Sequence, residues 1–266
     1  MQKNSNDMPE NQQQHTSLVL SGGGVRGMAH IGFIRAINEH GIQIDRVAGA
    51  SAGALVGALF ANGNHTDDML AFFKEAPLFK YNYFNIHKPG LIDTDRYYDL
   101  LKGFLKHDLF EELNKPLHVA ATNLVDGTLK EFNSGELIRP LLASASLTPV
   151  FSPVEIDGEL FADGGILSNF PLEFVEEKST QIIGSNTTAL GRLSAKQLKN
   201  ALQITTRVSS LMIYSRTAEK LKRCSFYIQP EGLKKIGFLD KSGVEKAYQI
   251  GYEEGNRAIE TYLNTA

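Results

Sequence analysis

Two short apolar segments, residues 18–20 and 46–50, each lead directly into a glycine-rich turn and then into a segment with helical spacing. The first helical segment, 25–39, has apolar side chains at every third position and small residues between them. The second, 51–61, is small and apolar throughout, which is typical of a buried helix. Strand, helix, strand and helix in succession indicate a parallel sheet covered by helices. The sequence therefore predicts an α/β fold.

Further strands and helices are expected along the rest of the chain. Two Asp-Gly pairs, at 126–127 and 157–158, predict hairpins. Because we find no repeat and no linker, we expect one domain over residues 17–266. Residues 1–16 are polar and rich in Asn and Gln, and we expect them to be disordered. The other strand candidates are 116–124, 180–185 and 225–229, and the other long helical patterns cover 194–223 and 242–262.

Composition and charge argue against several classes of protein. A formal net charge of -3 argues against a nucleic-acid binder. The single cysteine, Cys224, can form no intramolecular disulfide and fits no zinc-ligand spacing. The longest uncharged stretch, 47–66, has an apolar part shorter than the roughly 20 residues of a membrane span. A polar N-terminus without a secretory signal favours a cytoplasmic location, although export that uses no cleaved apolar signal also fits.

The turn after the second strand reads GASAG, residues 49–53, and places a serine between a strand and a helix. In a nucleophile elbow, small residues on both sides of the serine let the strand and the helix approach and leave the hydroxyl exposed. Amide groups at the start of the helix then favour developing negative charge. The competing interpretation is a small-residue turn packed under the core. The strand-turn-helix context favours Ser51 as a nucleophile.

A serine hydroxyl is a weak nucleophile and needs a base. No histidine follows His118, so a C-terminal triad histidine is impossible, and His30 and His118 lie in apolar segments typical of core side chains. A carboxylate is therefore the better candidate. Asp163 ends a predicted strand in VEIDGELFADGG, and no complementary strand follows to make its Asp-Gly a hairpin. A turn or helix-capping role for Asp163 stays open at this point.

The glycine-rich loop after the first strand, SGGGVRG at 21–27, allows two interpretations. Its glycines at 22, 24 and 27 fit the spacing of a dinucleotide-binding loop, but such a loop can also direct amides at an oxyanion. A dinucleotide site requires an acid at the end of the second strand, where this chain has Gly49, Ala50 and Ser51. The oxyanion interpretation is therefore favoured.

Together, SGGGVRG, GASAG and ADGG at 162–165, in this order, resemble the patatin-like phospholipases, as does the intervening ASASLTPVFSPVEIDGELF. The resemblance implies a three-layer α/β/α sandwich with a mostly parallel central sheet, and cleavage of lipid esters with no cofactor and no metal in the bond-breaking step. It also implies that Ser51 is the nucleophile and Asp163 the base of a Ser-Asp dyad. The implied oxyanion-hole loop comprises Gly22, Gly23, Gly24, Arg26 and Gly27.

Several alternatives remain open on the sequence. An acyltransferase would share the dyad and differ only in the acceptor, and a nucleotide-binding oxidoreductase is the second alternative. The expected partner is a lipid substrate, with a membrane surface as a possible setting, while the oligomeric state is undetermined. Arg26 either holds the loop or meets an anionic head group. Basic side chains at Arg216, Lys220 and Arg223 either complement a helix dipole or contact anionic lipid. An aromatic cluster lines an acyl channel or packs in the core, and it comprises Phe72, Phe73, Phe79, Tyr81, Tyr83 and Phe84.

Overall fold

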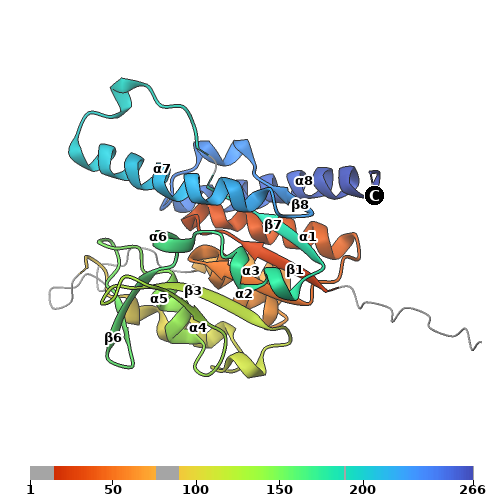
Figure 1. The fold of residues 1–266 in the computed structure, drawn as a ribbon, viewed down its shortest axis with the longest axis horizontal. Helices are drawn as coiled ribbons and strands as arrows, with labels where there is room; N and C mark the ends of the chain where they lie inside the picture. The colour runs from red at the N-terminus through yellow and green to blue at the C-terminus, as the bar shows by residue number, and fades with distance from the viewer. Residues whose placement is uncertain (1–14, 76–89, 189, 266) are drawn as a thin grey trace, which may run out of the picture.

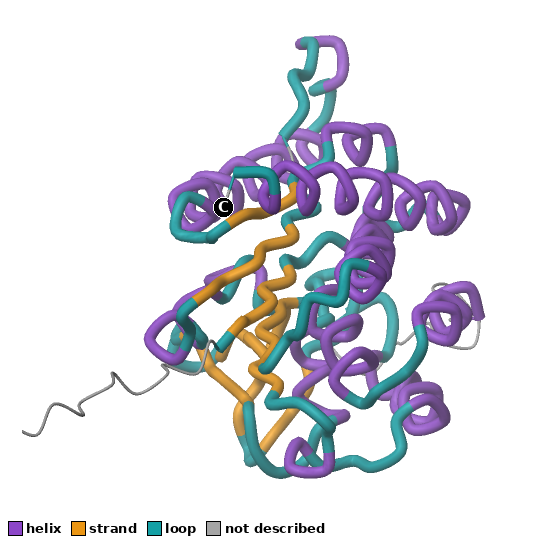
Figure 2. Tube along the Cα trace, turned by 90° about the vertical axis from the view of Figure 1, so that its right-hand side faces the viewer, coloured by secondary structure: helices purple, strands orange, loops and turns teal. Residues whose placement is uncertain are grey.

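A computed structural model describes residues 15–75, 90–188 and 190–265, and within them the centre of the molecule is an eight-stranded sheet. Helices cover both faces of this sheet (Figures 1 and 2). The strands are β1 (Thr16–Leu20), β2 (Arg46–Ala50), β3 (Leu117–Asn123), β4 (Leu129–Phe132), β5 (Val154–Ile156), β6 (Glu159–Asp163), β7 (Gln181–Ser185) and β8 (Phe226–Ile228). The helices are α1 (Met28–Glu39), α2 (Ala52–Ala61), α3 (Thr66–Glu75), α4 (Tyr98–Phe104), α5 (Ile138–Ser144), α6 (Gly165–Ser168), α7 (Ala201–Leu221) and α8 (Val244–Leu263).

The strand order is β5-β6-β3-β2-β1-β7-β8, and β4 also pairs with β3. The run β3-β2-β1-β7-β8 is parallel, whereas β4, β5 and β6 form the antiparallel part of the sheet. This confirms the predicted α/β fold with a mostly parallel sheet, and both Asp-Gly hairpins form as expected, joining β3 to β4 and β5 to β6. Short 3-10 helices connect several elements: η1 (Gly24–Gly27), η3 (Thr94–Tyr97), η4 (Phe110–Glu112), η5 (Leu172–Phe174), η6 (Glu176–Lys178), η7 (Ala195–Gln197), η8 (Glu231–Lys235) and η9 (Lys241–Gly243).

The core divides into two layers because successive strand residues point to opposite faces of the sheet. In β1, Leu18 and Leu20 join the large cluster under α1, α2 and α8. Val19 instead joins a smaller cluster with Phe170 and Leu221, where the segment after β6 and the end of α7 cover the other face. The three-layer arrangement therefore follows from the alternation of apolar side chains in the strands.

Some boundaries differ from those expected. The first strand begins at Thr16, two residues before the apolar run, and its amide donates to Asp45 Oδ2 at 2.7 Å. The helix expected over 194–223 is shorter, because α7 begins at Ala201 and only η7 lies before it. Polar residues 1–14 and four members of the aromatic cluster, at 79, 81, 83 and 84, lie outside the described residues. In the part of the chain that is described, no helix is both long and apolar enough to cross a bilayer.

Candidate active site

Ser51 occupies a sharp turn between β2, which ends at Ala50, and α2, which begins at Ala52. Its backbone angles, φ 53° and ψ -126°, lie in a region that residues with a side chain rarely adopt. Glycine at position 53 lets the start of α2 lie very close to β1. A Cβ atom at Gly53 would be only 2.3 Å from the carbonyl oxygen of Leu20. The geometry matches a nucleophile elbow and leaves Ser51 partly exposed at the wall of two cavities.

The register of the sheet brings Asp163 to Ser51. Ala50, the last residue of β2, pairs with Ala120 of β3, and Asp163 of β6 pairs with the next β3 residue, Ala121. Asp163 Oδ2 accepts a hydrogen bond from Ser51 Oγ at 2.6 Å. The strand end therefore supplies a carboxylate directly beside the serine that follows β2.

Asp163 is buried, with 4% of its surface exposed, and burial raises the pKa of its carboxyl group to about 6. Hydrogen bonds from Ser51 Oγ and from the amide of Gly165, at 2.7 Å to Oδ1, oppose this shift. The carboxylate is thus held in one orientation by two donors, with a proton affinity above that of an exposed aspartate. Such a group can accept a proton from a hydroxyl near neutral pH.

Ser144, at the end of α5, forms hydrogen bonds both to Ser51 and to the residue after Asp163. No role is predicted for it from the sequence. Its Oγ accepts the Ser51 amide at 2.9 Å, and its carbonyl oxygen accepts the Gly164 amide at 3.3 Å. Two residues later, the carbonyl oxygen of Ser146 accepts the Asp163 amide at 3.1 Å. The ASAS segment, 143–146, therefore connects the serine turn to the end of β6, a contact between distant segments that no local sequence pattern indicates.

The glycine loop after β1 lies against the serine turn. A Cβ atom at Gly22 would lie 3.1 Å from Ser51 Cβ, so the backbone of the loop passes close to the hydroxyl. Three of the loop amides are already bonded: Gly22 donates to Asn169 O, Val25 to Phe238 O and Arg26 to Gly23 O. The amides of Gly23 and Gly24 have no acceptor among the described residues. They are therefore the amides left to meet an oxygen of a bound molecule.

The C-terminal part of the chain holds the glycine loop from the other side. Gly24 has a φ of +55°, and a Cβ there would lie 2.3 Å from the carbonyl oxygen of Phe238. Arg26 Nε donates to Ile236 O at 2.6 Å, and its guanidinium lies 4.4 Å from the centroid of the Phe238 ring. These contacts favour the loop-holding role for Arg26. Gly27 lies in η1, where a Cβ would be 2.6 Å from Ala52 Cβ, so glycine lets the loop approach α2.

His30 and His118 are buried, as expected of core side chains. His30 is fully buried between Ser185 Oγ and the carbonyl oxygen of Ser21, both at 2.8 Å, and burial lowers its pKa to about 4. The imidazole therefore stays neutral, and its contact with Ser21 positions the start of the glycine loop. His118 Nδ1 contacts Glu131 at 2.5 Å, and burial also lowers the pKa of this imidazole.

Two of the three cations at the end of α7 are engaged by carboxylates. Lys220 Nζ lies 2.7 Å from Glu173 Oε2, and Arg223 pairs with Glu176. These ion pairs fasten the segment after β6 to α7. The charges of Lys220 and Arg223 are therefore balanced within the protein, which favours a structural role over contact with an anionic lipid.

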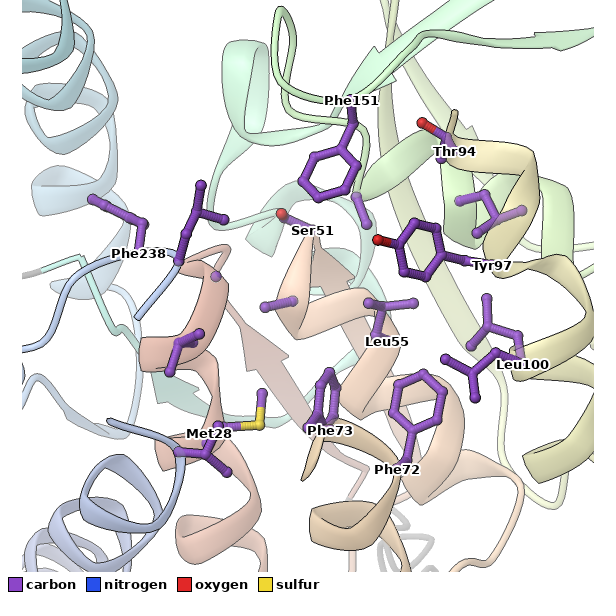
Figure 3. A pocket seen from close by; sticks show the side chains of 18 residues that line it. Met28, Ser51, Leu55, Phe72, Phe73, Thr94, Tyr97, Leu100, Phe151 and Phe238 are labelled. Atoms are coloured by element: carbon purple, nitrogen blue, oxygen red, sulfur yellow. The ribbon is translucent and has the colours of Figure 1, made fainter. Parts of the chain in front are cut away.

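An apolar cavity opens beside Ser51 and leads into the core, and Figure 3 shows Ser51 at one end of it. Phe151 and Phe238 flank the serine, whereas Phe72 and Phe73 lie deeper. The cavity has a volume of about 130 Å³, and its lining is almost entirely apolar. Two members of the expected aromatic cluster, Phe72 and Phe73, are therefore part of its wall.

A second cavity, of about 550 Å³, meets the first at Ser51 and also contains Asp163. Its walls are more polar, and they include three cations, Arg26, Arg207 and Lys234. Asp163 is the one carboxylate among its lining residues. An apolar and a cationic cavity thus converge on one hydroxyl. Within the described ranges, no three His, Cys, Asp or Glu side chains are arranged to hold a metal ion.

Comparison with known proteins identifies the family. A model of the patatin-like phospholipases matches residues 18–175, more than half of the chain. The chain belongs to the patatin-like phospholipase family. The matched range contains Ser51 and Asp163, while the Phe238 contact and the α7 wall of the second cavity lie beyond it.

The relatives agree with this assignment. An uncharacterized NTE family protein of Mycobacterium tuberculosis is 34% identical over 159 residues, which are 59% of this chain and 44% of that protein. Lysophospholipase NTE1 of Meyerozyma guilliermondii is 30% identical over 172 residues, 62% of this chain and 12% of that protein. The match thus spans less than half the length of these curated relatives. The crystal structure of VipD from Legionella pneumophila shares the fold, with a TM-score of 0.54 and 17% identity over 94% of this chain and 67% of VipD.

Proposed function

We propose that this protein is a serine lipid acyl hydrolase of the phospholipase A or lysophospholipase type. The observation that carries the proposal is the 2.6 Å hydrogen bond from Ser51 Oγ to the buried carboxylate of Asp163. Membership of the patatin-like phospholipase family supports a lipid ester as the substrate.

In the first half of the proposed reaction, Asp163 accepts the proton of Ser51 as Oγ attacks the ester carbonyl carbon. Negative charge develops on the carbonyl oxygen, and the unpaired amides of Gly23 and Gly24 donate to it. The bond to the alcohol oxygen breaks, and that oxygen takes the proton from Asp163. The acyl group is then attached to Ser51.

In the second half, water attacks the acyl-enzyme. Asp163 accepts a proton from the water, and the same glycine amides stabilise the second oxyanion. Collapse of this intermediate returns the proton to Ser51 Oγ and releases the fatty acid. Each half therefore uses one carboxylate alternately as base and acid, which suits a pKa of about 6.

The two cavities suggest how the lipid is oriented. The narrow apolar cavity suits an acyl chain, because burial of each methylene group contributes about 0.8 kcal/mol. The wider cavity suits an anionic head group, because Arg207 and Lys234 face it along with Arg26. Lys234 pairs with Glu231 and Arg26 holds Ile236, whereas Arg207 forms no ion pair or hydrogen bond within the described part of the chain. We therefore assign the phosphate contact to Arg207.

The test is fatty-acid release from a lysophospholipid by the purified protein. We expect release by the wild type, loss to background in Ser51→Ala, and a loss of about 10³-fold or more in Asp163→Asn. Ser134→Ala changes an exposed serine that lines neither cavity and should retain full activity. An ether analogue of the lipid should release nothing. Acyl transfer to an added alcohol without fatty-acid release would favour an acyltransferase instead.

A further inference from the structure

Helix α7 carries a row of apolar side chains that no other described element covers. Ile204, Val208, Leu211 and Met212 are 49%, 48%, 44% and 61% exposed. Their spacing of four, three and one residues places them on one side of the helix. Single exposed apolar side chains are ordinary, but a contiguous group marks an interaction surface. We call these four residues the α7 outer face.

Other residues of α7 form part of the proposed active site, with Arg207 at the edge of the outer face and Ser210 and Ile213 on the far side. Arg207, Ser210 and Ile213 line the second cavity, and Thr217 and Leu221 are buried. In Figure 1 the N-terminal part of α7 extends beyond the sheet, and the segment leading into it arches away from the body. A helix with its side chains is about 10 Å across. Whatever covers the α7 outer face therefore lies within about one helix diameter of the cavity that contains Ser51.

Exposed apolar side chains also lie at the margin of the second cavity. Leu147, Ile166 and Leu193 line the second cavity and are nevertheless 39%, 41% and 38% exposed. They come from three separate segments of the chain. The apolar surface is therefore a property of the cavity margin as well as of the helix.

The segment that leads into α7 and forms most of it carries only positive charges. The sequence between Lys178 and Glu219 contains no Asp or Glu, but it contains five cations: Arg192, Lys196, Lys199, Arg207 and Arg216. The chain as a whole has a net charge of -3, so the charge of this segment is opposite in sign to that of the whole chain. Arg192, Lys196 and Lys199 are exposed, and none forms an ion pair with any described residue. Such a combination of an apolar helix face with neighbouring cations is typical of helices that lie on anionic membranes.

We propose that the α7 outer face docks on an anionic lipid bilayer, with its apolar residues in the interface and the cations of 192–199 against the head groups. The bilayer is favoured over a protein partner because exposed apolar side chains also lie at the margin of a cavity suited to a lipid, and because the neighbouring segment carries cations and no carboxylate. Binding to the bilayer is independent of catalysis. Its role in delivering substrate to Ser51 rests on the function proposed above.

The first experiment is cosedimentation of the full chain with vesicles of phosphatidylcholine alone or mixed with phosphatidylglycerol. The wild type should bind the mixed vesicles, and binding should weaken as salt is added. Leu211→Gln/Met212→Gln should lower the vesicle affinity about tenfold or more, because two interfacial side chains are lost. Lys196→Gln/Lys199→Gln should bind mixed vesicles weakly and lose most of the preference for phosphatidylglycerol.

The matched control is Leu124→Gln/Val125→Gln, which changes an equally exposed apolar pair, 44% and 67% exposed, after β3. It should bind like the wild type. The proposal is overturned if the wild type does not bind mixed vesicles, or if the α7 and control variants bind equally well. It is also overturned if the α7 variant only converts a dimer into a monomer in gel filtration, because a second copy would then cover this face.

Activity separates this proposal from the proposed function. The α7 outer face does not line either cavity, so Leu211→Gln/Met212→Gln should hydrolyse a short water-soluble ester at the wild-type rate. Its activity on lysophospholipid in mixed vesicles should fall with binding. Vesicle binding without hydrolysis by the wild type would support the docking surface and refute the hydrolase. Hydrolysis of the soluble ester without vesicle binding would support the hydrolase and refute the docking surface.

Discussion

Ser51 and Asp163 are 112 positions apart in the sequence, yet Ser51 Oγ lies 2.6 Å from Asp163 Oδ2. The strand pairing explains this distance, because Ala50, which precedes Ser51, pairs with Ala120, and Asp163 pairs with the next residue of β3, Ala121. The carboxyl group is buried, so any charge on it is less screened than at the surface. From this one contact follow expectations for the pH dependence of activity and for stability.

Activity should depend on the ionisation of Asp163. Its pKa is raised to about 6 by burial, and only the ionised form can accept the Ser51 proton. We expect kcat/KM on a soluble ester to fall about tenfold for each pH unit below that value and to level off above it. The measurement is a pH-rate profile, with circular dichroism at each pH to verify folding. A rate that stays constant down to about pH 4.5 would rule out Asp163 as the base.

The raised pKa of Asp163 also lowers the free energy of unfolding at neutral pH. Its folded pKa of about 6 exceeds the ordinary value of 3.8, so the folded state binds more protons. Stability from this group is therefore present below the lower pKa and is lost as the pH rises to the higher one. Asp163→Asn removes the ionisation and should be more stable than the wild type above pH 7 by up to about 3 kcal/mol, relative to the difference at about pH 4. Urea denaturation at both pH values measures this, and an equal difference at the two would contradict it.

The backbone of Ser51 should favour glycine once the hydroxyl is removed. At φ 53° a Cβ atom is strained, so Ser51→Gly should be about 1 kcal/mol more stable than Ser51→Ala although both are inactive. Ala54→Gly, in the helical backbone of α2, should instead be less stable than the wild type, because glycine disfavours a helix. Thermal denaturation of the variants provides the test. Equal stability of the two Ser51 variants would argue against strain at the turn.

Head-group recognition should depend on Arg207. Arg207→Gln removes the cation that we assign to the phosphate, and KM for a lysophospholipid should rise about tenfold while KM for a monoacylglycerol of the same chain stays unchanged. Arg192→Gln, which removes an exposed cation that lines neither cavity, is the matched control with detergent-solubilised substrates. If Arg207→Gln affects both substrates equally, then Arg207 supports the helix or the cavity wall and not a phosphate.

Local patterns in the sequence located the turns correctly. GASAG predicts the Ser51 turn because its chemistry is contained within five residues between a strand and a helix. The α/β class is also predictable, because the first two strands and helices alternate without interruption. The apolar surroundings of His30 in the sequence predict a core residue, and the structure confirms it.

Contacts between distant segments were not accessible in this way. Nothing local to Ser144 indicates that its hydroxyl accepts the amide of Ser51, and nothing near Phe238 indicates that its carbonyl oxygen meets the glycine loop. Both depend on the order of the strands and on where the C-terminal segment packs. The sequence does not indicate the apolar face of α7 for a different reason: Leu211, Met212 and Ile213 are consecutive, and only the structure shows which side of the helix is left uncovered.

The most direct test of the central claim is labelling with a fluorophosphonate, which reacts with an activated serine, followed by peptide mapping. We expect the label on Ser51 in the wild type, none in Ser51→Ala, and labelling slowed at least about tenfold in Asp163→Asn, all three being folded. Labelling of a different serine, or an unchanged rate in Asp163→Asn, would contradict the account that Ser51 is activated by Asp163.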